Sequence, residues 1–313
     1  MTSTAATPGT ANGPGTGRKL SNKAIGLIFA GIWIGGMIIL ILIFGFGHQN
    51  HEFQIQNEFK LINWVHLGVF SINRAVVYLF ISTILTVGTM LWIAGRMHQR
   101  PNKVQTAVEI LYSLMRDNIT RGNMEDRMAA RWFPFMGALF LFIWFNNIIG
   151  YLPLPTNSEQ TVNIFGAHIP SFALYAATAN ISVPLVLAIV VFVIFNWVGI
   201  STHGPIGYLK SLIPAGVHGA ILLLIFPLEI ISTFMRLLSL TIRLFANILA
   251  GHMIILFMTG GLAVLLGLSF LGWFTIPFAV LLYIFELGLI ATLQAFIFAT
   301  LAAIYISGAA THH

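Results

Sequence analysis

Long apolar runs alternate with short polar segments along the whole chain, and this pattern predicts membrane-spanning helices. A helix rises about 1.5 Å per residue, so roughly 20 apolar residues cross a hydrocarbon layer about 30 Å thick. Runs of that length lie at about 24–47, 75–94, 132–151 and 181–200. Together with the longer apolar stretch that follows them, they predict an all-α membrane protein with about six membrane helices.

The stretch 217–307 is almost entirely apolar and is long enough for two helices of about 40 residues each. Each would measure roughly 60 Å, about twice the thickness of the hydrocarbon layer. We therefore expect the last two membrane helices to be tilted, bent or broken. Small residues near the middle of the stretch favour a hairpin turn between them; these are Gly260, Gly261, Gly267, Gly272 and Pro277.

The N-terminal end differs from the rest. Residues 1–23 are mostly Thr, Ala, Gly and Pro without an apolar period, which predicts a disordered leader. The run 24–47 that follows is longer than the core of a signal peptide, and no A-x-A cleavage site comes after it. We therefore expect an extra N-terminal membrane span there, before a membrane domain over 75–313.

Composition agrees with a membrane protein, because 58% of the 313 residues are hydrophobic and only 8% are charged. The absence of cysteine excludes disulfide scaffolds and Cys-ligated metal sites. The net charge of +6 could indicate a nucleic-acid partner. However, Lys and Arg gather between the apolar runs, as in cytoplasmic loops that face anionic lipid. We expect a lipid bilayer and no nucleic acid.

The distribution of basic residues also predicts the orientation. Segment 96–131 holds seven of the fifteen Lys and Arg residues, whereas 152–180 holds none. The first segment should therefore face the cytoplasm and the second the outside, with both chain ends cytoplasmic. Within 96–131, apolar residues at helical spacing predict an amphipathic helix on the cytoplasmic membrane surface, with solvated charge on its other face; they are Val104, Ala107, Val108, Leu111, Leu114 and Met115.

Polar side chains interrupt both long helices. Inserting an ionisable side chain into a membrane costs at least about 2.5–3.5 kcal/mol of free energy. We therefore expect these side chains to form a functional pathway. At about 100° per residue, positions seven apart drift only about 20°. One face therefore carries most of the first helix's polar residues, namely Glu229, Arg236, Ser239, Arg243 and Asn247. His252 points about 180° away from Arg243, so the row of polar residues changes to the other side of the helix near Arg243.

The second helix carries Glu286 and Gln294. If it runs antiparallel with Gln294 opposite Arg243, Glu286 falls at the depth of His252, where the two can bind and pass a proton. Alanines at every fourth position let another helix approach closely, either an external partner or the chain's own hairpin; they are Ala291, Ala295, Ala299 and Ala303.

These residues carry a resemblance to a known family. "RLFANILAGH" at 243–252, with Glu229 fourteen residues before its Arg, and "TLQAFIFATLAAIYI" in the last helix resemble subunit a of rotary F-type ATP synthases. The resemblance runs from about residue 75 to the end. It includes "PNKVQTAVEILYSLM", "FIWFNNIIGYLP" and "TANISVPLVLAIVVF".

The resemblance implies a proton-translocating stator subunit of the Fo sector, in a bacterial inner membrane and not an enzyme by itself. Its partners would be the ring of c subunits, the b subunit of the peripheral stalk and the rest of the F1Fo complex. Arg243 would be the essential arginine that faces the ring carboxylates. Glu229, Arg236 and Ser239 would lie toward the cytoplasmic half-channel, and the outer one would hold Asn247, His252, Glu286 and Gln294.

The chain departs from the family pattern in two places within the hairpin. Glu286 stands eight residues before Gln294 where seven is usual, which turns it about 80° instead of −20° relative to Gln294. A local π-bulge would restore the register. Leu237 stands where a proline commonly follows the residue that matches Arg236, so a kink expected there would be absent.

Each polar residue also has a structural alternative. Arg243 could pair with an acid of its own chain, and Glu229 and Arg236 could snorkel or pair. Ser239, Asn247 and Gln294 could form interhelical hydrogen bonds. His252 could be a buried histidine with satisfied hydrogen bonds. Asn146 and Asn147 are interpreted as helix-terminus residues.

Other functional classes lack their sequence features. A secondary ion-coupled transporter would show internal repeats and paired broken helices, and an intramembrane hydrolase would need a nucleophile with a base or a metal pair such as H-x-x-x-H. Neither pattern is found in the sequence. No second His or Cys accompanies His252 at ligand spacing, so we expect no metal and no cofactor.

Overall fold

The computed structural model describes most of the chain, and the predicted leader lies almost wholly outside the described part, as does Gly267. The described residues are 22–44, 63–67, 70–95, 103–164, 167–211, 220–261 and 269–311.

Helices dominate this part of the chain and confirm the all-α membrane fold. Five helical stretches are long and apolar enough to cross a membrane, at 74–95, 126–150, 182–211, 221–259 and 275–310. The elements are α1 (Asn22–Phe44), α2 (Arg74–Gly95), α3 (Lys103–Ser113), η2 (Leu114–Arg121), α4 (Asp126–Gly150), η3 (Ala177–Ala179), α5 (Ser182–Ser211), α6 (Ala220–Leu256), η4 (Phe257–Gly261), α8 (Ser269–Phe285), η5 (Glu286–Ile290) and α9 (Ala291–Ala310). That α1 is a sixth span stays a prediction.

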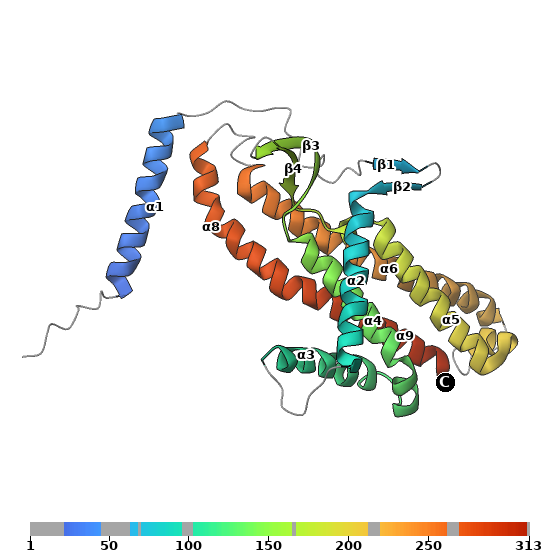
Figure 1. Cartoon of the computed structure of the whole chain (residues 1–313). Helices are drawn as coiled ribbons and strands as arrows, with labels where there is room; N and C mark the ends of the chain where they lie inside the picture. Colours follow the sequence, from blue (N-terminus) through green and yellow to red (C-terminus); the bar gives the residue numbers. More distant parts are fainter. Residues whose placement is uncertain are drawn as a thin grey trace, which may run out of the picture.

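Two short antiparallel hairpins were not predicted from the sequence. β1 (Asn63–Leu67) pairs with β2 (Phe70–Asn73), and β3 (Leu154–Ile164) pairs with β4 (Ala167–Ala173). Both lie at the same end of the helices (Figure 1). They occupy segments that join apolar runs, at the end that the basic residues predict to face outside.

The last part of the chain forms the expected hairpin of long helices. α6 has 37 residues, or about 55 Å at 1.5 Å per residue, and α8, η5 and α9 run back past it. Both arms lie obliquely to α2 (Figure 1). The turn differs from the prediction in one respect. Gly272 and Pro277 lie inside α8 and not between the arms, as membrane helices tolerate such residues.

A sharp kink divides α5, which was predicted to end near residue 200. Gly204 has φ +71° and ψ 165°, a conformation that glycine adopts without steric cost. Pro205 then starts a second helical piece, for which its fixed φ is suited. This piece folds back so that the Tyr208 ring packs on Gly199. The Tyr208 hydroxyl donates to Asn196 Oδ1 at 2.9 Å.

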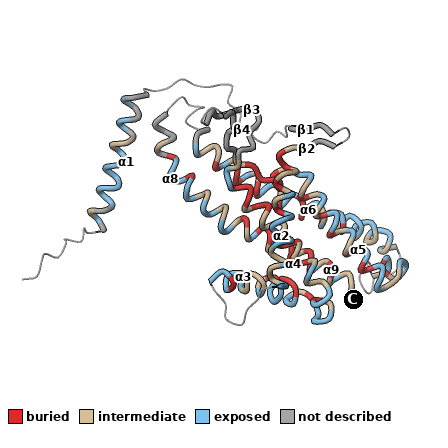
Figure 2. Tube along the Cα trace, in the orientation of Figure 1, coloured by how far each residue is buried: buried red, intermediate tan, exposed pale blue. Residues whose placement is uncertain are grey.

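The core lies where α9 packs against α4 and α5, and Figure 2 shows buried residues through the middle of the helix bundle. The predicted alanine stripe is fully buried there. Ala295, Ala299 and Ala303 share one apolar cluster with residues of α4 and α5. The stripe therefore receives helices of its own chain. Of the two alternatives the internal one is right, although the partners are α4 and α5 more than the other arm of the hairpin.

The segment 103–121 is helical but follows the amphipathic prediction only in part. Leu111, Leu114 and Met115 pack on the core, whereas Val104 is exposed and Gln105 is buried. The helix continues into η2, and its position on the membrane surface stays a prediction.

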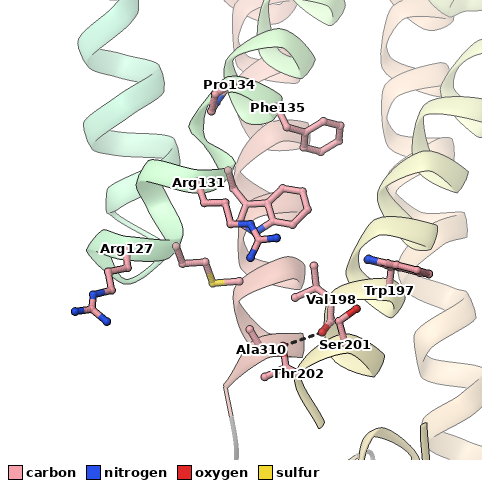
Figure 3. Close-up of a pocket in the computed structure, with 11 residues that line it drawn as sticks. Arg127, Arg131, Pro134, Phe135, Trp197, Val198, Ser201, Thr202 and Ala310 are labelled. Carbon is pink, nitrogen blue, oxygen red and sulfur yellow. Dashed lines mark hydrogen bonds between the residues drawn. The ribbon is translucent and has the colours of Figure 1, made fainter. Parts of the chain in front are cut away.

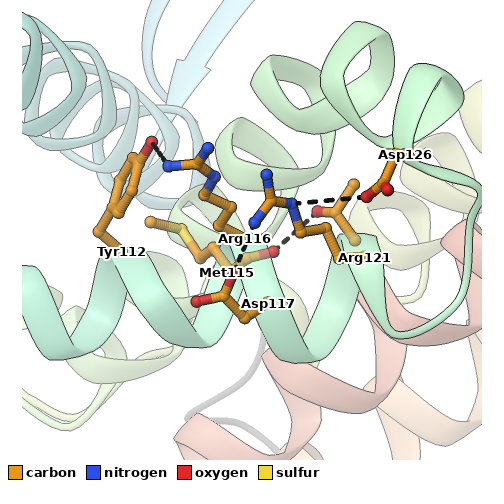
Figure 4. A network of polar contacts seen from close by, with 7 residues as sticks. Tyr112, Met115, Arg116, Asp117, Arg121 and Asp126 are labelled. Atoms are coloured by element: carbon orange, nitrogen blue, oxygen red, sulfur yellow. Dashed lines mark hydrogen bonds and ion pairs between the residues drawn. The ribbon is translucent and has the colours of Figure 1, made fainter.

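Ion pairs connect the end of this segment to α4. Arg121 lies 3.6 Å from Asp117 and 4.0 Å from Asp126, the first residue of α4 (Figure 4). These two acids are thus already engaged by one arginine.

We expect Ala299→Leu to destabilise the helix bundle, because its extra carbons enter a fully packed site between α4 and α5. Overpacking of this kind costs about 1–3 kcal/mol. The measurement is the amount of folded protein in membranes and its thermal midpoint after purification. Ala130→Leu, at an exposed position of α4, is the matched control. Equal stability of the two variants would contradict the packing described.

Candidate functional site

Arg243 lies near the middle of α6 on an exposed face. Its side chain forms no ion pair with any acid in the described part of the chain. Ser239 and Asn247, one turn before and after it, are exposed too. The spacing argument that put these three residues on one face is therefore confirmed.

A neighbouring face of α6, about 100° round the helix, fixes this orientation. Leu240, Leu244 and Ile248 recur every fourth residue and are buried in the core cluster. Side chains at this spacing share one side of a helix. Packing of this apolar stripe on the other helices therefore turns Arg243 away from the rest of the chain, toward whatever lies beside α6.

Glu229 and Arg236 meet in the first half of α6. Arg236 Nη2 lies 3.6 Å from Glu229 Oε1, and both side chains are partly exposed. The Arg236 guanidinium also lies 5.7 Å from the centre of the Tyr305 ring on α9. The two residues that were predicted either to pair or to serve a pathway thus do pair.

This ion pair lines a cavity of about 390 Å³. Its other polar walls come from Tyr208 and Ser211 of the folded-back end of α5, and from Thr233 of α6. A cavity of this size with charged and hydroxyl groups on several sides can hold water. The kink at Gly204 is what brings the α5 residues to it.

Glu286 begins the π-helical segment η5 on the second arm. A π-turn accommodates one extra residue, which meets the condition set by the eight-residue spacing to Gln294. The carboxyl group lies directly against α6, because a Cβ added to Gly251 would stand 2.5 Å from Glu286 Cδ. Glycine at 251 therefore makes room for this carboxyl group beside His252.

His252 is buried, with 1% of its surface exposed. Its Nδ1 lies 3.0 Å from the Ile248 carbonyl oxygen, and its Nε2 lies 3.1 Å from that of Gly150. Either neutral tautomer thus finds an acceptor, and only the protonated ring donates to both. No ion pair joins His252 to Glu286 within the described residues.

Tyr151, which directly follows α4, connects His252 and Glu286. Its hydroxyl donates to Glu286 Oε2 at 3.0 Å, and its ring centre lies 4.3 Å from that of His252. Its backbone carbonyl accepts a hydrogen bond of 2.6 Å from the Tyr283 hydroxyl of α8. Tyr151 is fully buried. It therefore fixes the carboxyl group and the imidazole at one level, from the end of a third helix.

Sequence reasoning missed Tyr151 and understated Asn147. Asn147 does lie in the last turn of α4, but it is fully buried. It donates to the Ala291 carbonyl at 3.3 Å and accepts from the Thr178 hydroxyl at 2.9 Å. It thereby joins three elements. The polar residue followed by Gly-Tyr at a helix end was the available signal, but only the tertiary fold gives these residues their partners.

Gln294 is buried on α9, with 5% of its surface exposed. The expected position opposite Arg243 stays a prediction. The chain thus places two polar clusters along α6, one around Glu229 and Arg236 and the other around His252 and Glu286. Between them lies the exposed Arg243. From residue 229 to residue 252 the helix rises about 35 Å.

Comparison with known proteins gives consistent matches. A family model described as ATP synthase A chain matches residues 76–307. A protein named ATP synthase subunit a from Rubrobacter xylanophilus is 34% identical over 259 residues, which are 82% of this chain and 91% of the relative. Its counterpart from Frankia alni is 34% identical over 84% of this chain and 88% of its own. The protein of the same name from Paramagnetospirillum magneticum is 35% identical over 68% of this chain and 78% of the relative.

Proposed function

We propose, from the premise that the chain belongs to the family of ATP synthase subunit a, that it is the stator subunit through which protons reach and leave a ring of c subunits. The family makes it a multi-pass membrane subunit of the ATP synthase complex. The observation that carries the proposal is the exposed guanidinium of Arg243, which has no acidic partner in the described part of its own chain.

Arg243 supplies the electrostatic step. A guanidinium stays charged at any relevant pH, and in a low-dielectric surrounding it attracts an ionised carboxylate strongly. A ring carboxylate that arrives beside it is therefore favoured in its ionised form and releases its proton. The same fixed cation repels a proton moving directly along α6. Ion flux then requires rotation of the ring.

The two polar clusters serve as the two half-channels of this proposal. The cavity beside Glu229 and Arg236 supports an aqueous path on the side predicted to be cytoplasmic. The cluster of Tyr151, His252 and Glu286 supports a path from the outer side. Protons enter at one polar cluster and leave at the other. Arg243 lies between the two clusters and separates the two half-channels.

Tyr151 acts in the outer path as a positioning residue. Its hydroxyl holds the Glu286 carboxyl group, and its ring covers His252. Glu286 then exchanges protons with the outside and delivers them toward the ring from a fixed position. Tyr283 supports this arrangement through the backbone of Tyr151.

The setting completes the proposal. The basic segment 96–131 supports an orientation with both termini in the cytoplasm, and the bacterial relatives support an inner-membrane location. The subunit catalyses no chemical reaction by itself and works with the c ring, the b subunit and the rest of the F1Fo complex. A membrane potential of 100 mV supplies about 2.3 kcal/mol per proton, so several protons are needed for each ATP.

Arg243→Ala should abolish ATP-driven proton pumping, because the ring carboxylates lose the cation that favours their ionised form. Pumping is measured as acidification of inverted membrane vesicles, with ring co-purification as the check on assembly. Arg116→Ala, which removes an exposed arginine of η2, should pump normally. Normal pumping by an assembled Arg243→Ala complex would reject the role of Arg243.

Tyr151→Phe keeps the ring on His252 and removes the hydroxyl that binds Glu286. A hydrogen bond to a charged group contributes about 1.5–3 kcal/mol, so we expect passive proton flux through F1-stripped vesicles to fall about tenfold. Glu286→Gln should slow flux as well. Because Tyr151 acts through Glu286, adding Tyr151→Phe to Glu286→Gln should change little further.

The control for this pair is Tyr175→Phe, a buried tyrosine outside the cluster of Tyr151, His252 and Glu286. If the double variant lost proton flux by the product of the two single losses, Tyr151 would not act through Glu286. An unchanged flux in Glu286→Gln would remove Glu286 from the path.

Gly251→Ala should lower proton flux without lowering the amount of assembled complex. The added methyl group would meet the Glu286 carboxyl carbon at 2.5 Å, and the flexible end of that side chain can move aside at little energetic cost. The carboxyl group would then leave the Tyr151 hydroxyl. Gly88→Ala on α2, where a Cβ meets nothing within 4 Å, is the matched control. Equal flux in both variants would argue against a fixed Glu286.

A further inference from the structure

A second pocket lies between the start of α4, the kinked part of α5 and the end of α9, away from both polar clusters on α6. Its volume is about 590 Å³, within the range of about 300–1,000 Å³ typical of ligand sites. Its walls are mixed, since its lining residues include Arg127, Arg131 and Ser201 together with Trp132, Phe135 and Trp197. We propose that it binds the headgroup phosphate of an anionic phospholipid.

The charge of the pocket is uncompensated. Arg127 and Arg131 are four residues apart on α4, so their side chains project from one face of the helix. Neither forms an ion pair within the described residues, and no acid lines the pocket. The nearby Asp117 and Asp126 are engaged by Arg121 (Figure 4). Guanidinium groups bind phosphate oxygens in a bidentate manner.

Arg131 is the charged side chain that is placed to reach a phosphate group in the pocket. Figure 3 shows Arg131 reaching into the space between the helices, while Arg127 stands at the rim and points outward. On the α5 side, the Thr202 hydroxyl already donates to the Val198 carbonyl at 2.9 Å. The Ser201 hydroxyl has no partner among the described residues and can donate to the ligand.

The apolar walls favour a lipid over free phosphate. Trp197, with 69% of its surface exposed, and Phe135 lie on stretches long and apolar enough to cross a membrane. Tryptophan side chains gather at the level of lipid headgroups, and basic pockets between membrane helices at the cytoplasmic side bind anionic headgroups. The phosphate would lie at Arg131 with Arg127 at the rim, and the acyl chains would extend along Trp197 and Phe135 toward the hydrocarbon.

The test uses the intact ATP synthase complex in detergent, titrated with dioleoyl phosphatidylglycerol and followed by native mass spectrometry. Binding to the subunit should weaken about tenfold or more in Arg127→Gln/Arg131→Gln, since hydrogen bonds to charged groups are lost. Arg116→Gln, which removes one positive charge from an arginine outside the pocket, should bind as the unchanged complex does. Ring co-purification confirms that each variant assembles.

Further arms separate the possible occupants. Dioleoyl phosphatidylcholine should bind at least tenfold more weakly, and excess inorganic phosphate should not displace phosphatidylglycerol. Arg131→Lys, which keeps the charge but loses the bidentate geometry, should give intermediate binding. Equal binding of phosphatidylglycerol to the double glutamine variant, displacement by inorganic phosphate, or cross-linking of a residue placed at Trp197 to a helix of another subunit would each overturn the proposal.

Discussion

A guanidinium that stays charged within a membrane-spanning helix sets the main constraint on this molecule. Such a charge costs at least about 2.5–3.5 kcal/mol to insert, and it is tolerated only when water or an opposite charge compensates it. The described part of the chain offers Arg243 no acid. The compensation must therefore come from water or from an acid beyond the described residues, and the proposed function assigns it to ring carboxylates that pass one at a time.

The rest of the fold keeps that cation in place and separates the two polar clusters. The apolar stripe of Leu240, Leu244 and Ile248 anchors the back of α6. The buried alanines of α9 allow α4 and α5 to approach closely, which brings the end of α4 to His252 and Glu286. The same packing sets the folded-back end of α5 beside Glu229 and Arg236. Each cluster thus depends on helices far from it in sequence.

The spacing of apolar and polar residues was sufficient to predict several of these structural features. Apolar runs predicted the membrane helices from residue 75 onward, and residue spacing predicted the face that carries Ser239, Arg243 and Asn247. The eight-residue interval between Glu286 and Gln294, compared with the seven usual in the family it resembles, required a π-bulge to keep the register, and η5 is π-helical. These features are local, because the angle per residue and the rise per residue determine them.

Features that depend on contacts between distant segments could not be predicted in this way. Tyr151 acquires its role only where α4, α6 and η5 meet, and the partners of the alanine stripe depend on the order in which helices pack. The fold-back of α5 depends on one left-handed residue, Gly204, followed by proline. The two β-hairpins lie in joining segments whose apolar pattern was too weak to indicate strands.

Disulfide cross-linking to the ring tests the central claim most directly, and the chain's lack of native cysteine makes it clean. One cysteine replaces Ser239 on the open face of α6 or Leu244 on its buried face, and a second is placed one helical turn from the carboxylate of the ring subunit. Efficient cross-linking from position 239 and none from position 244 is the expected result. Cross-linking from position 244, or none from position 239 in an assembled complex, would contradict an Arg243 that faces the ring.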